Sequence, residues 1–293
     1  MKRHRHTVRH ARSAGSRQQA EAGHVIPCAP TSTALTTKVE LMDGAQLRVG
    51  VLTPHAAAGP EVELQEMASG CVTVVVARVR SDDTVADGTP PSTASGLRAL
   101  ADLSVLLGAA EPFHDGSVDV VAYASTSSSY VVGHVAESAL VESLRQSCGV
   151  PAVASGSSAV EALRSCRSQR VALVHPPWFD EEVDELGVRY FRDQGFDVSL
   201  FNARDLPDDP SRVEPVHVVD WVVQHVGAEA DAVFLGGNGF RAAAAIEELE
   251  RRTDRLVLES NQVLLWSILT ATHTPWDVAG YGRLLRTVQS ASG

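Results

Sequence analysis

The stretch Val118-Asp-Val-Val-Ala-Tyr-Ala-Ser-Thr-Ser-Ser-Ser-Tyr130 joins an apolar run to a small polar turn, and Ala230-Asp-Ala-Val-Phe-Leu-Gly-Gly-Asn-Gly-Phe-Arg241 repeats that arrangement. Short apolar runs that end in a turn are typical of strands buried in a parallel sheet. Ligands of α/β proteins are normally held at the carboxyl ends of such strands. The two related turns therefore predict one site that is shared by two related halves of the chain.

Strands and helices alternate along the chain from Gln46. The first part has the pattern of strands at 47–53, 72–79, 118–123 and 152–154. Helical patterns lie between and after them, near 61–67, 96–107, 135–147 and 159–166. Strands separated by helices favour a parallel sheet.

The sequence starts again at Arg170. The segment Val171–Leu186 resembles Val49–Leu64, and the later segments 197–201, 232–235 and 256–263 match 72–79, 118–123 and 152–159 in the same order. Four matched elements predict two α/β domains related by a pseudo-twofold axis, with their strand ends facing each other. A single eight-stranded barrel would also alternate strands and helices, but the four-plus-four repeat favours two domains.

We therefore expect an α/β fold with two four-stranded parallel sheets, each flanked by helices. The expected domains are a first half at 46–168 and a second half at 169–285. Residues 1–45 show no sustained periodicity and are expected to be a disordered basic tail, with a nucleic-acid arm or a transit peptide as alternatives. Residues 286–293 are expected to be a short tail.

The charge of the chain is unevenly distributed. The formal net charge is −11, yet residues 1–20 carry six Lys or Arg and no acid, which leaves −17 on the remainder. A body this acidic is a poor match for nucleic acid. No stretch reaches the roughly 18 apolar residues of a membrane span, and the chain start lacks the apolar region of a secretory signal.

Cysteine usage indicates a reducing compartment. The four cysteines are Cys28, Cys71, Cys148 and Cys166, with no CxxC and no spacing suited to a metal. Disulfides and a metal site are not expected, and each cysteine is expected to be a small buried or half-buried residue. The sequence thus predicts a cytoplasmic protein.

Five segments together carry a family resemblance. They are Gly50-Val-Leu-Thr-Pro54, Asp119-Val-Val-Ala-Tyr-Ala-Ser-Thr-Ser127, Ala172-Leu-Val-His-Pro176, Asp231-Ala-Val-Phe-Leu235 and Ser260-Asn-Gln-Val-Leu-Leu-Trp266. In this order and at these spacings the chain resembles the maleate cis-trans isomerase and arylmalonate decarboxylase family, within the aspartate/glutamate racemase superfamily. The resemblance implies cofactor-free chemistry on a small carboxylate substrate, and leaves a homo-oligomer open.

The resemblance also implies where catalytic thiols would stand. Racemases and isomerases of the family use two cysteines, one from each half, whereas its decarboxylases keep only the second. Here the first position falls on Ser125 and the second on Gly236. A hydroxyl is a far weaker acid than a thiol, and glycine has no side chain, so the two-thiol mechanism is not expected.

The anion-binding part of the family pattern is retained. Thr126 and Ser127 match the hydroxyl pair that holds the substrate carboxylate, and Gly237 and Asn238 follow the second position, where backbone N–H groups are expected to act similarly. Such donors can contribute about 3–4 kcal/mol each where charge develops. A turn that merely caps the next helix is the alternative reading of residues 125–129.

Three further residues are candidates at the strand ends. His55 follows Pro54 where isomerases of the family show Pro-Ser-Ser-Asn, and an imidazole there would serve as acid or base, with a structural histidine as the alternative. Trp178 follows Pro177 where the family has Pro-Tyr; it would favour a bulkier or partly apolar ligand unless it is a core residue. His175 is a further candidate acid.

The leading hypothesis is a cofactor-independent isomerase or decarboxylase that works through a stabilised enediolate. Ser125 or His55 would transfer the proton, and Pro54, Trp178 and Gly236 would line the site with the anion-binding residues. The alternative is a catalytically inactive carboxylate-binding or regulatory protein with the same fold. Hydrolase-type chemistry by Ser125 would need a neighbouring base, and no Gly-x-Ser-x-Gly elbow supports it.

Overall fold

The computed structural model describes residues 46–54, 59–81 and 93–286. The expected basic tail at 1–45 lies outside the described residues. So does His55, and so does the end of the chain after Arg286.

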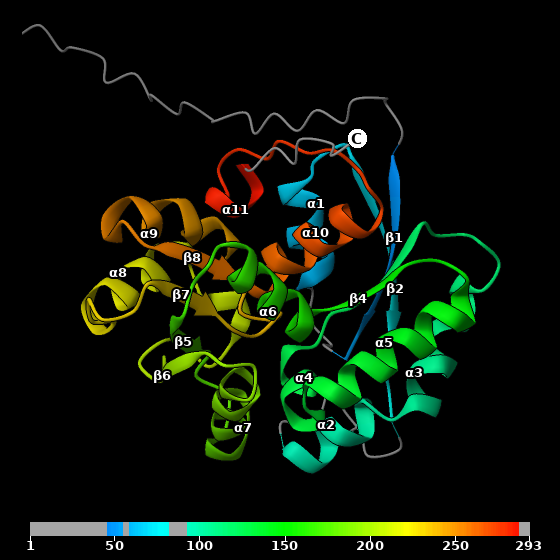
Figure 1. Cartoon of the computed structure of the whole chain (residues 1–293), viewed down its shortest axis with the longest axis horizontal. Helices are drawn as coiled ribbons and strands as arrows, with labels where there is room; N and C mark the ends of the chain where they lie inside the picture. The colour runs from blue at the N-terminus through cyan, green and yellow to red at the C-terminus, as the bar shows by residue number, and fades with distance from the viewer. Residues whose placement is uncertain (1–45, 55–58, 82–92, 287–293) are drawn as a thin grey trace, which may run out of the picture. The chain divides into compact units, whose positions relative to one another are not determined.

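Two four-stranded parallel sheets form the core of the described chain (Figure 1). The first has the order β2-β1-β3-β4 and the second the order β6-β5-β7-β8. The strands are β1 (Leu47–Thr53), β2 (Val72–Arg78), β3 (Val120–Tyr123), β4 (Ala152–Ala154), β5 (Arg170–His175), β6 (Asp197–Asn202), β7 (Ala232–Leu235) and β8 (Leu256–Glu259). The identical strand order confirms the predicted fold class and excludes the eight-stranded barrel.

Helices cover both sheets. In the first half they are α1 (Pro60–Met67), α2 (Ala94–Leu100), α3 (Leu103–Ala110), α4 (Thr126–Val132), α5 (His134–Cys148) and α6 (Ser155–Ser165). In the second half they are α7 (Glu181–Arg192), α8 (Pro215–His225), α9 (Ile246–Thr253), α10 (Ser260–Ala271) and α11 (Arg283–Arg286). Within the described ranges, no helix is both long and apolar enough to cross a membrane.

The central strands are buried on both faces, as their apolar sequences require. All residues of β3 and β7 are buried. A matching aspartate precedes each strand: Asp119 accepts the Arg48 N–H at 2.7 Å, and Asp231 accepts the Arg170 N–H at 3.1 Å. These contacts fix β3 against β1 and β7 against β5, so the sequence repeat extends to the hydrogen bonds that begin the strands.

The two halves share one apolar core. Helices α6 and α10, each of which follows the last strand of its half, pack against each other and lie between the sheets in Figure 1. Buried side chains of both halves form one continuous cluster, which includes Leu163 and Leu264. The domain boundary expected at residues 168 and 169 falls between α6 and β5.

Two local predictions were wrong. The helix expected over 96–107 is split, because α2 ends at Leu100 with Ala101 as its C-cap, and the Asp102 carboxylate caps α3 by accepting the Ser104 N–H at 2.8 Å. The segment Ser125–Ser129, expected as a turn, instead begins helix α4. A run of hydroxyl residues has weak helix propensity, and packing of the buried helix overrides it.

The described cysteines depart in part from expectation. Cys71 and Cys148 are buried, as predicted. Cys166 is exposed at the end of α6, which corrects the prediction of a buried or half-buried residue. Cys28 lies outside the described residues.

Candidate active site

The two polar turns of the repeat meet at Thr126 and Asn238. The Asn238 Oδ1 atom accepts the Thr126 N–H at 2.9 Å and the Thr126 hydroxyl at 2.7 Å. Both residues are buried. Because Thr126 begins α4 and Asn238 follows β7, these two hydrogen bonds join the strand ends of the two halves.

Each turn also contacts the strand-to-helix junction of the opposite half. Thr126 Oγ1 lies 3.0 Å from Ser260 Oγ at the start of α10, and Asn238 Nδ2 donates to Ser155 Oγ at the start of α6, at 2.9 Å. Ser155 and Ser260 are each the first residue of the helix that follows the last strand of its half. The junction therefore has the pseudo-twofold pattern of the sheets themselves.

The buried carboxylate of Glu63 is connected to this junction through Asn261. Asn261 Nδ2 donates to Glu63 Oε2 at 2.6 Å and to the Asn238 carbonyl at 3.0 Å, while the Ala243 N–H donates to Glu63 Oε1 at 3.0 Å. Burial raises the pKa of Glu63 to about 7, against the lowering effect of these hydrogen bonds. Glu63 of the first half is thus held entirely by donors of the second half.

A second buried carboxylate lies next to Glu63. Glu259 caps α10 by accepting the N–H groups of Asn261 and Gln262 at 2.8 and 3.0 Å. Burial, and then the charge of Glu63, raise the pKa of Glu259 well above its ordinary value. Burial and the nearby like charge both act against the charged form of this carboxyl group.

Some backbone and side-chain donors of the turns are not used by the protein. Among the described residues, none accepts from the Ser127 hydroxyl, the Ser127 N–H or the Asn238 N–H. The Gly237 N–H, by contrast, donates to Ser260 Oγ at 2.8 Å. The predicted anion-binding residues are therefore brought together, and Ser127 and Asn238 retain donors for a ligand.

Ser125 has a structural position in this arrangement. Its hydroxyl is fully buried, donates to Ser128 Oγ at 2.7 Å and accepts the Ser128 N–H at 3.4 Å as the N-cap of α4. No histidine or carboxylate of the described residues makes a hydrogen bond to it. The predicted partner His55 lies outside the described residues, so the structure supplies no base for Ser125.

A histidine–aspartate pair lies at the end of β5. His175 is the last residue of that strand, and its Nδ1 atom is 2.8 Å from Asp184 Oδ1 on α7. Asn202 Nδ2 donates to the other Asp184 oxygen at 2.7 Å. Burial lowers the pKa of His175, and Asp184 acts in the opposite direction. A neutral imidazole with its proton on Nδ1 fits this contact and leaves a lone pair on Nε2.

Gly236 lies directly against this histidine. A Cβ atom at Gly236 would be 3.0 Å from the Tyr130 hydroxyl, 3.0 Å from His175 Cδ2 and 3.4 Å from His175 Nε2. The Tyr130 hydroxyl and His175 Nε2 are both buried, and neither has a hydrogen-bond partner among the described residues. The position that the resemblance assigns to the second thiol is thus occupied by an imidazole and a phenol.

Tyr130 was not identified from the sequence. A turn over 125–129 gives Tyr130 no defined direction, whereas a helix that starts at Thr126 places it one helical turn further on the same side. Burial, then the charges of Glu137 and Asp184, raise its pKa well above the ordinary range. A prediction of helix α4 from the sequence would have placed Tyr130 beside the site.

The other predicted residues lie around the second turn. Trp178 is half-buried and packs edge-on against Phe240, with ring centroids 5.9 Å apart. Pro54 is buried at the end of β1. Gly59 begins the next described segment and lies against the Asn238 backbone, since a Cβ atom there would be 3.1 Å from the Asn238 carbonyl oxygen. Trp178 therefore flanks the second turn, close to the residues that follow β7.

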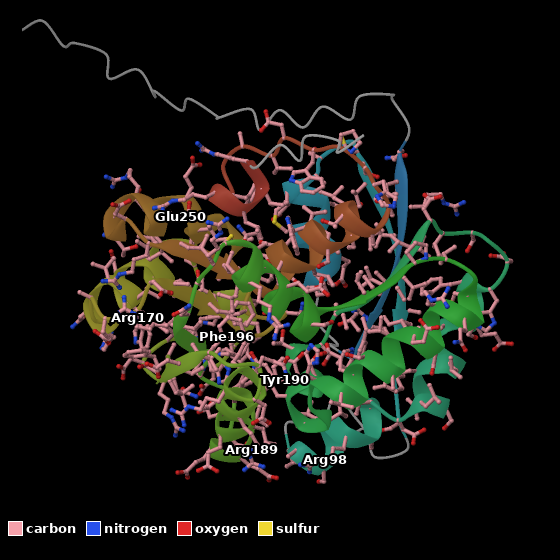
Figure 2. The ribbon with its side chains drawn as sticks, in the orientation of Figure 1. Arg98, Arg170, Arg189, Tyr190, Phe196 and Glu250 are labelled. Carbon is pink, nitrogen blue, oxygen red and sulfur yellow. The ribbon has the colours of Figure 1, made fainter. Side chains whose placement is uncertain are left out.

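A cavity of about 190 Å³ opens beside Tyr130, between α7 and the start of α5. Its lining includes Tyr130, His134, Arg189 and Tyr190. Figure 2 shows Arg189 and Tyr190 on α7, where the Tyr190 hydroxyl donates to the buried Glu137 carboxylate of α5. Glu137 also accepts the Ser129 hydroxyl at 2.7 Å, so α4, α5 and α7 are tied together next to Tyr130.

Comparison with known proteins identifies the family. The arylmalonate decarboxylase family model matches residues 102–285, which is more than half of the chain. The chain belongs to the arylmalonate decarboxylase family. A curated maleate isomerase from Pseudomonas putida is 26% identical over 179 residues, covering 58% of this chain and 71% of that protein.

Solved structures of the same kind share the fold. A maleate isomerase from another Pseudomonas putida strain superposes with a TM-score of 0.72 at 22% identity, over 83% of this chain and 99% of that chain. Unliganded arylmalonate decarboxylase superposes with a TM-score of 0.68 at 19% identity, over 82% of this chain and 99% of that chain. A Nocardia farcinica maleate cis-trans isomerase variant with a covalently bound succinylcysteine intermediate superposes with a TM-score of 0.69 at 24% identity. The match covers 83% of this chain and 99% of that chain. The family fold is therefore complete across both sheets.

Proposed function

We propose that this member of the arylmalonate decarboxylase family is a cofactor-independent decarboxylase or isomerase that acts on a small carboxylate through an enediolate. Its relatives include maleate isomerases and arylmalonate decarboxylases. The observation that carries the proposal is the junction of Thr126 with Asn238, which brings the polar strand ends of both halves to one point. Strand ends that meet in this way are the usual ligand site of α/β proteins.

The anion would be held by donors that the protein itself leaves unused. These are the hydroxyl and N–H of Ser127 and the N–H of Asn238. The Thr126–Asn238 hydrogen bonds keep the two donor segments at a fixed separation, so little reorganisation is needed when charge develops on the substrate. Preorganised donors of this kind stabilise an enediolate by about 3–4 kcal/mol each.

Decarboxylation is the favoured reaction of the two. It breaks the bond between the α-carbon and one carboxylate, leaves the electron pair on the remaining carboxylate as an enediolate, releases CO₂ and then needs one proton at the α-carbon. One proton-transfer group is enough for this sequence. Racemisation needs groups on both faces, and Ser125 has no described base beside it. Trp178 adds an apolar wall that suits an aryl substituent.

The test is turnover of phenylmalonate and of maleate in D₂O, followed by NMR. We expect CO₂ release from phenylmalonate, with deuterium at the α-carbon of the product. Ser127→Ala should lower turnover about 10²–10³-fold, in line with loss of one anion donor. Ser138→Ala is the matched control, because that exposed hydroxyl donates only to the His134 carbonyl within its own helix. Equal turnover in the two variants would contradict the assigned anion site.

A catalytically inactive carboxylate-binding protein is the second candidate. It is favoured by one observation: the Thr126 donors and the Gly237 N–H are already satisfied by Asn238 and Ser260. In that case phenylmalonate or maleate would bind with no CO₂ release, no isomerisation and no deuterium exchange. Calorimetric titration beside the NMR assay separates the two functions.

A further inference from the structure

We propose that His175, oriented by Asp184, is the proton-transfer group of this site and takes the place of the thiol that is absent at Gly236, with the Tyr130 hydroxyl as its neighbouring hydrogen-bond donor. The proposal rests on the proposed function, because it names the acid and base of the same reaction. It assigns that role to residues other than Ser125 and His55.

The first argument is the orientation of the imidazole. Asp184 Oδ1 lies 2.8 Å from His175 Nδ1. The other oxygen, Asp184 Oδ2, accepts a hydrogen bond from Asn202 Nδ2 at 2.7 Å and lies 3.9 Å from Arg204 Nη2. A carboxylate on one ring nitrogen sets the tautomer, so that the other nitrogen presents its lone pair. In this arrangement Nε2 is the nitrogen that takes up the proton and later donates it to the enediolate carbon.

The second argument is that two buried polar atoms are left unpaired at one point. His175 Nε2 and the Tyr130 hydroxyl lie 3.4 Å and 3.0 Å from the same position above Gly236. Each buried polar group without a partner costs about 1–3 kcal/mol, and native proteins seldom keep two together without a use.

The third argument comes from the internal repeat. His175 ends β5 as Thr53 ends β1, and the two residues match in the aligned segments of the two halves. Only the second half has an ionisable side chain at this position. The same half has glycine where the resemblance expects a thiol, so the imidazole and the missing thiol occur at neighbouring strand ends.

The chemistry balances with His175 as a single acid and base. After CO₂ leaves, the enediolate carbon takes the proton from Nε2–H of the imidazolium, and the electron pair of that N–H bond returns to the ring. The neutral imidazole then takes a proton from water, so one solvent proton is consumed for each CO₂ released. Asp184 stabilises the imidazolium, and the anionic substrate favours the charged ring further.

Tyr130 lies against both His175 and the cavity beside α7. Its ring lies 5.3 Å from the His175 ring, centroid to centroid, and it also lines the cavity beside α7. The hydroxyl would donate a hydrogen bond to the substrate carboxylate or to the enediolate. Glu137 and Asp184 are the charged groups that act on this phenol, and both hold it protonated.

Placement on one side of the site has a stereochemical consequence. His175, Asp184 and Gly236 all belong to the second half, and no described histidine or carboxylate makes a hydrogen bond to Ser125 in the first. The α-carbon should therefore be protonated on one face only. A prochiral arylmalonate such as methylphenylmalonate should give one enantiomer, with no racemisation of the product.

The test compares His175→Asn with wild type, using phenylmalonate as the probe. The asparagine amide can still donate to Asp184, but it has no basic nitrogen. We expect turnover to fall about 10²–10⁴-fold, as for loss of a general acid–base group, with the dissociation constant of phenylmalonate changed less than about threefold. His225→Asn is the matched control, since that ring bonds only the Trp221 carbonyl on α8.

A rescue variant separates chemistry from folding. In His175→Ala/Gly236→Cys the smaller residue 175 leaves room for a thiol, and we expect activity that iodoacetamide abolishes. Gly236→Cys alone places its Cβ atom 3.0 Å from His175 and Tyr130, and should not gain such activity. Iodoacetamide should leave the wild type active.

The outcomes distinguish the two proposals. Turnover of His175→Asn within about threefold of wild type would contradict the role of His175 and leave the decarboxylase function standing. Wild-type protein that binds phenylmalonate but releases no CO₂ would contradict both. Loss of turnover in His175→Asn with intact binding and folding supports the proposal.

Discussion

The two halves have the same strand order and the same crossed contacts at their junction, yet their strand ends carry different chemistry. In the first half the turn after β3 begins a helix, and Ser125 serves as its cap. In the second half the turn after β7 begins with Gly236, beside the histidine that ends β5. The two halves thus share a hydrogen-bond framework, while their strand ends carry different side chains.

The framework itself is divided unequally. The two buried glutamates that bridge the halves, Glu63 and Glu137, both belong to the first half. Their donors Asn261 and Tyr190 belong to the second. Both glutamates thus accept hydrogen bonds across the junction, whereas at Asn238 the acceptor belongs to the second half and the donor, Thr126, to the first.

The largest expected effect is loss of the bridge at Asn238. Asn238→Ala removes hydrogen bonds to Thr126, Ser155 and Asn261 and leaves their buried groups unpaired, so we expect the free energy of unfolding to fall by about 4 kcal/mol. Asn202→Ala, whose amide bonds only within the second half, should cost about 1–2 kcal/mol. Urea unfolding measures the free energy of unfolding of both variants. Equal decreases would show that the Asn238 hydrogen bonds between the halves stabilise the fold no more than those of Asn202 within one half.

The pH dependence of stability tests the role of Glu63, the buried acceptor of the first half. The pKa of Glu63 is raised from an ordinary 4.5 to about 7, so protonated Glu63 stabilises the fold below pH 4.5 and this contribution is lost as pH rises through 7. The free energy of unfolding should fall by up to about 3 kcal/mol between pH 5 and 8. Glu63→Gln should flatten that slope.

The charged groups that act on Glu63 are Arg241, Glu66 and the buried Glu259. Because Glu259 is coupled to it, Glu259→Gln is the companion variant, and its glutamine carbonyl can still cap α10. An unchanged slope in Glu63→Gln would assign the pH dependence to another group.

A smaller effect is expected from filling the space at Gly236. Gly236→Ala places a methyl group 3.0 Å from the Tyr130 hydroxyl and from His175 Cδ2, which should cost about 1–3 kcal/mol through overpacking. Gly236→Ala/Tyr130→Phe removes one of the two close contacts and should recover part of the loss. Thermal unfolding that shows no penalty in the single variant would mean that His175 and Tyr130 do not occupy this position.

The smallest effect is expected at the corresponding place in the first half. Ser125→Ala removes the N-cap of α4 and should cost about 1 kcal/mol in urea unfolding. Turnover of phenylmalonate should remain within a few-fold of wild type, because the structure supplies no base for this hydroxyl. A loss of turnover as large as that of His175→Asn would return the catalytic role to Ser125.

Periodicity predicted the fold closely because buried parallel strands leave a strong apolar signal. Strand β1 has the predicted bounds, and β7 was found in full at Ala232–Leu235. The break at Asp102 and the helix starting at Thr126 were missed, since capping and burial of hydroxyl residues depend on tertiary contacts that a local pattern does not contain.

The contact between the two paired turns could be predicted from the sequence, but the contacts of the candidate residues around it could not. The paired turns located Thr126 and Asn238, whose junction joins residues 112 positions apart. The contact of His175 with Asp184 spans nine residues, but it arises only because α7 folds back over the end of β5. The unpaired phenol of Tyr130 could not be foreseen without helix α4.

The tight surroundings of Gly236 also restrict the order in which substitutions can accumulate. A cysteine at this position would have its Cβ atom 3.0 Å from His175 Cδ2 and from the Tyr130 hydroxyl, so these side chains would have to shift to accept it. Replacing His175 first would remove one of the two close contacts, but that step also removes the proposed acid before the thiol is present. A lineage that exchanged a thiol and an imidazole by this route would cross an intermediate with weakened chemistry.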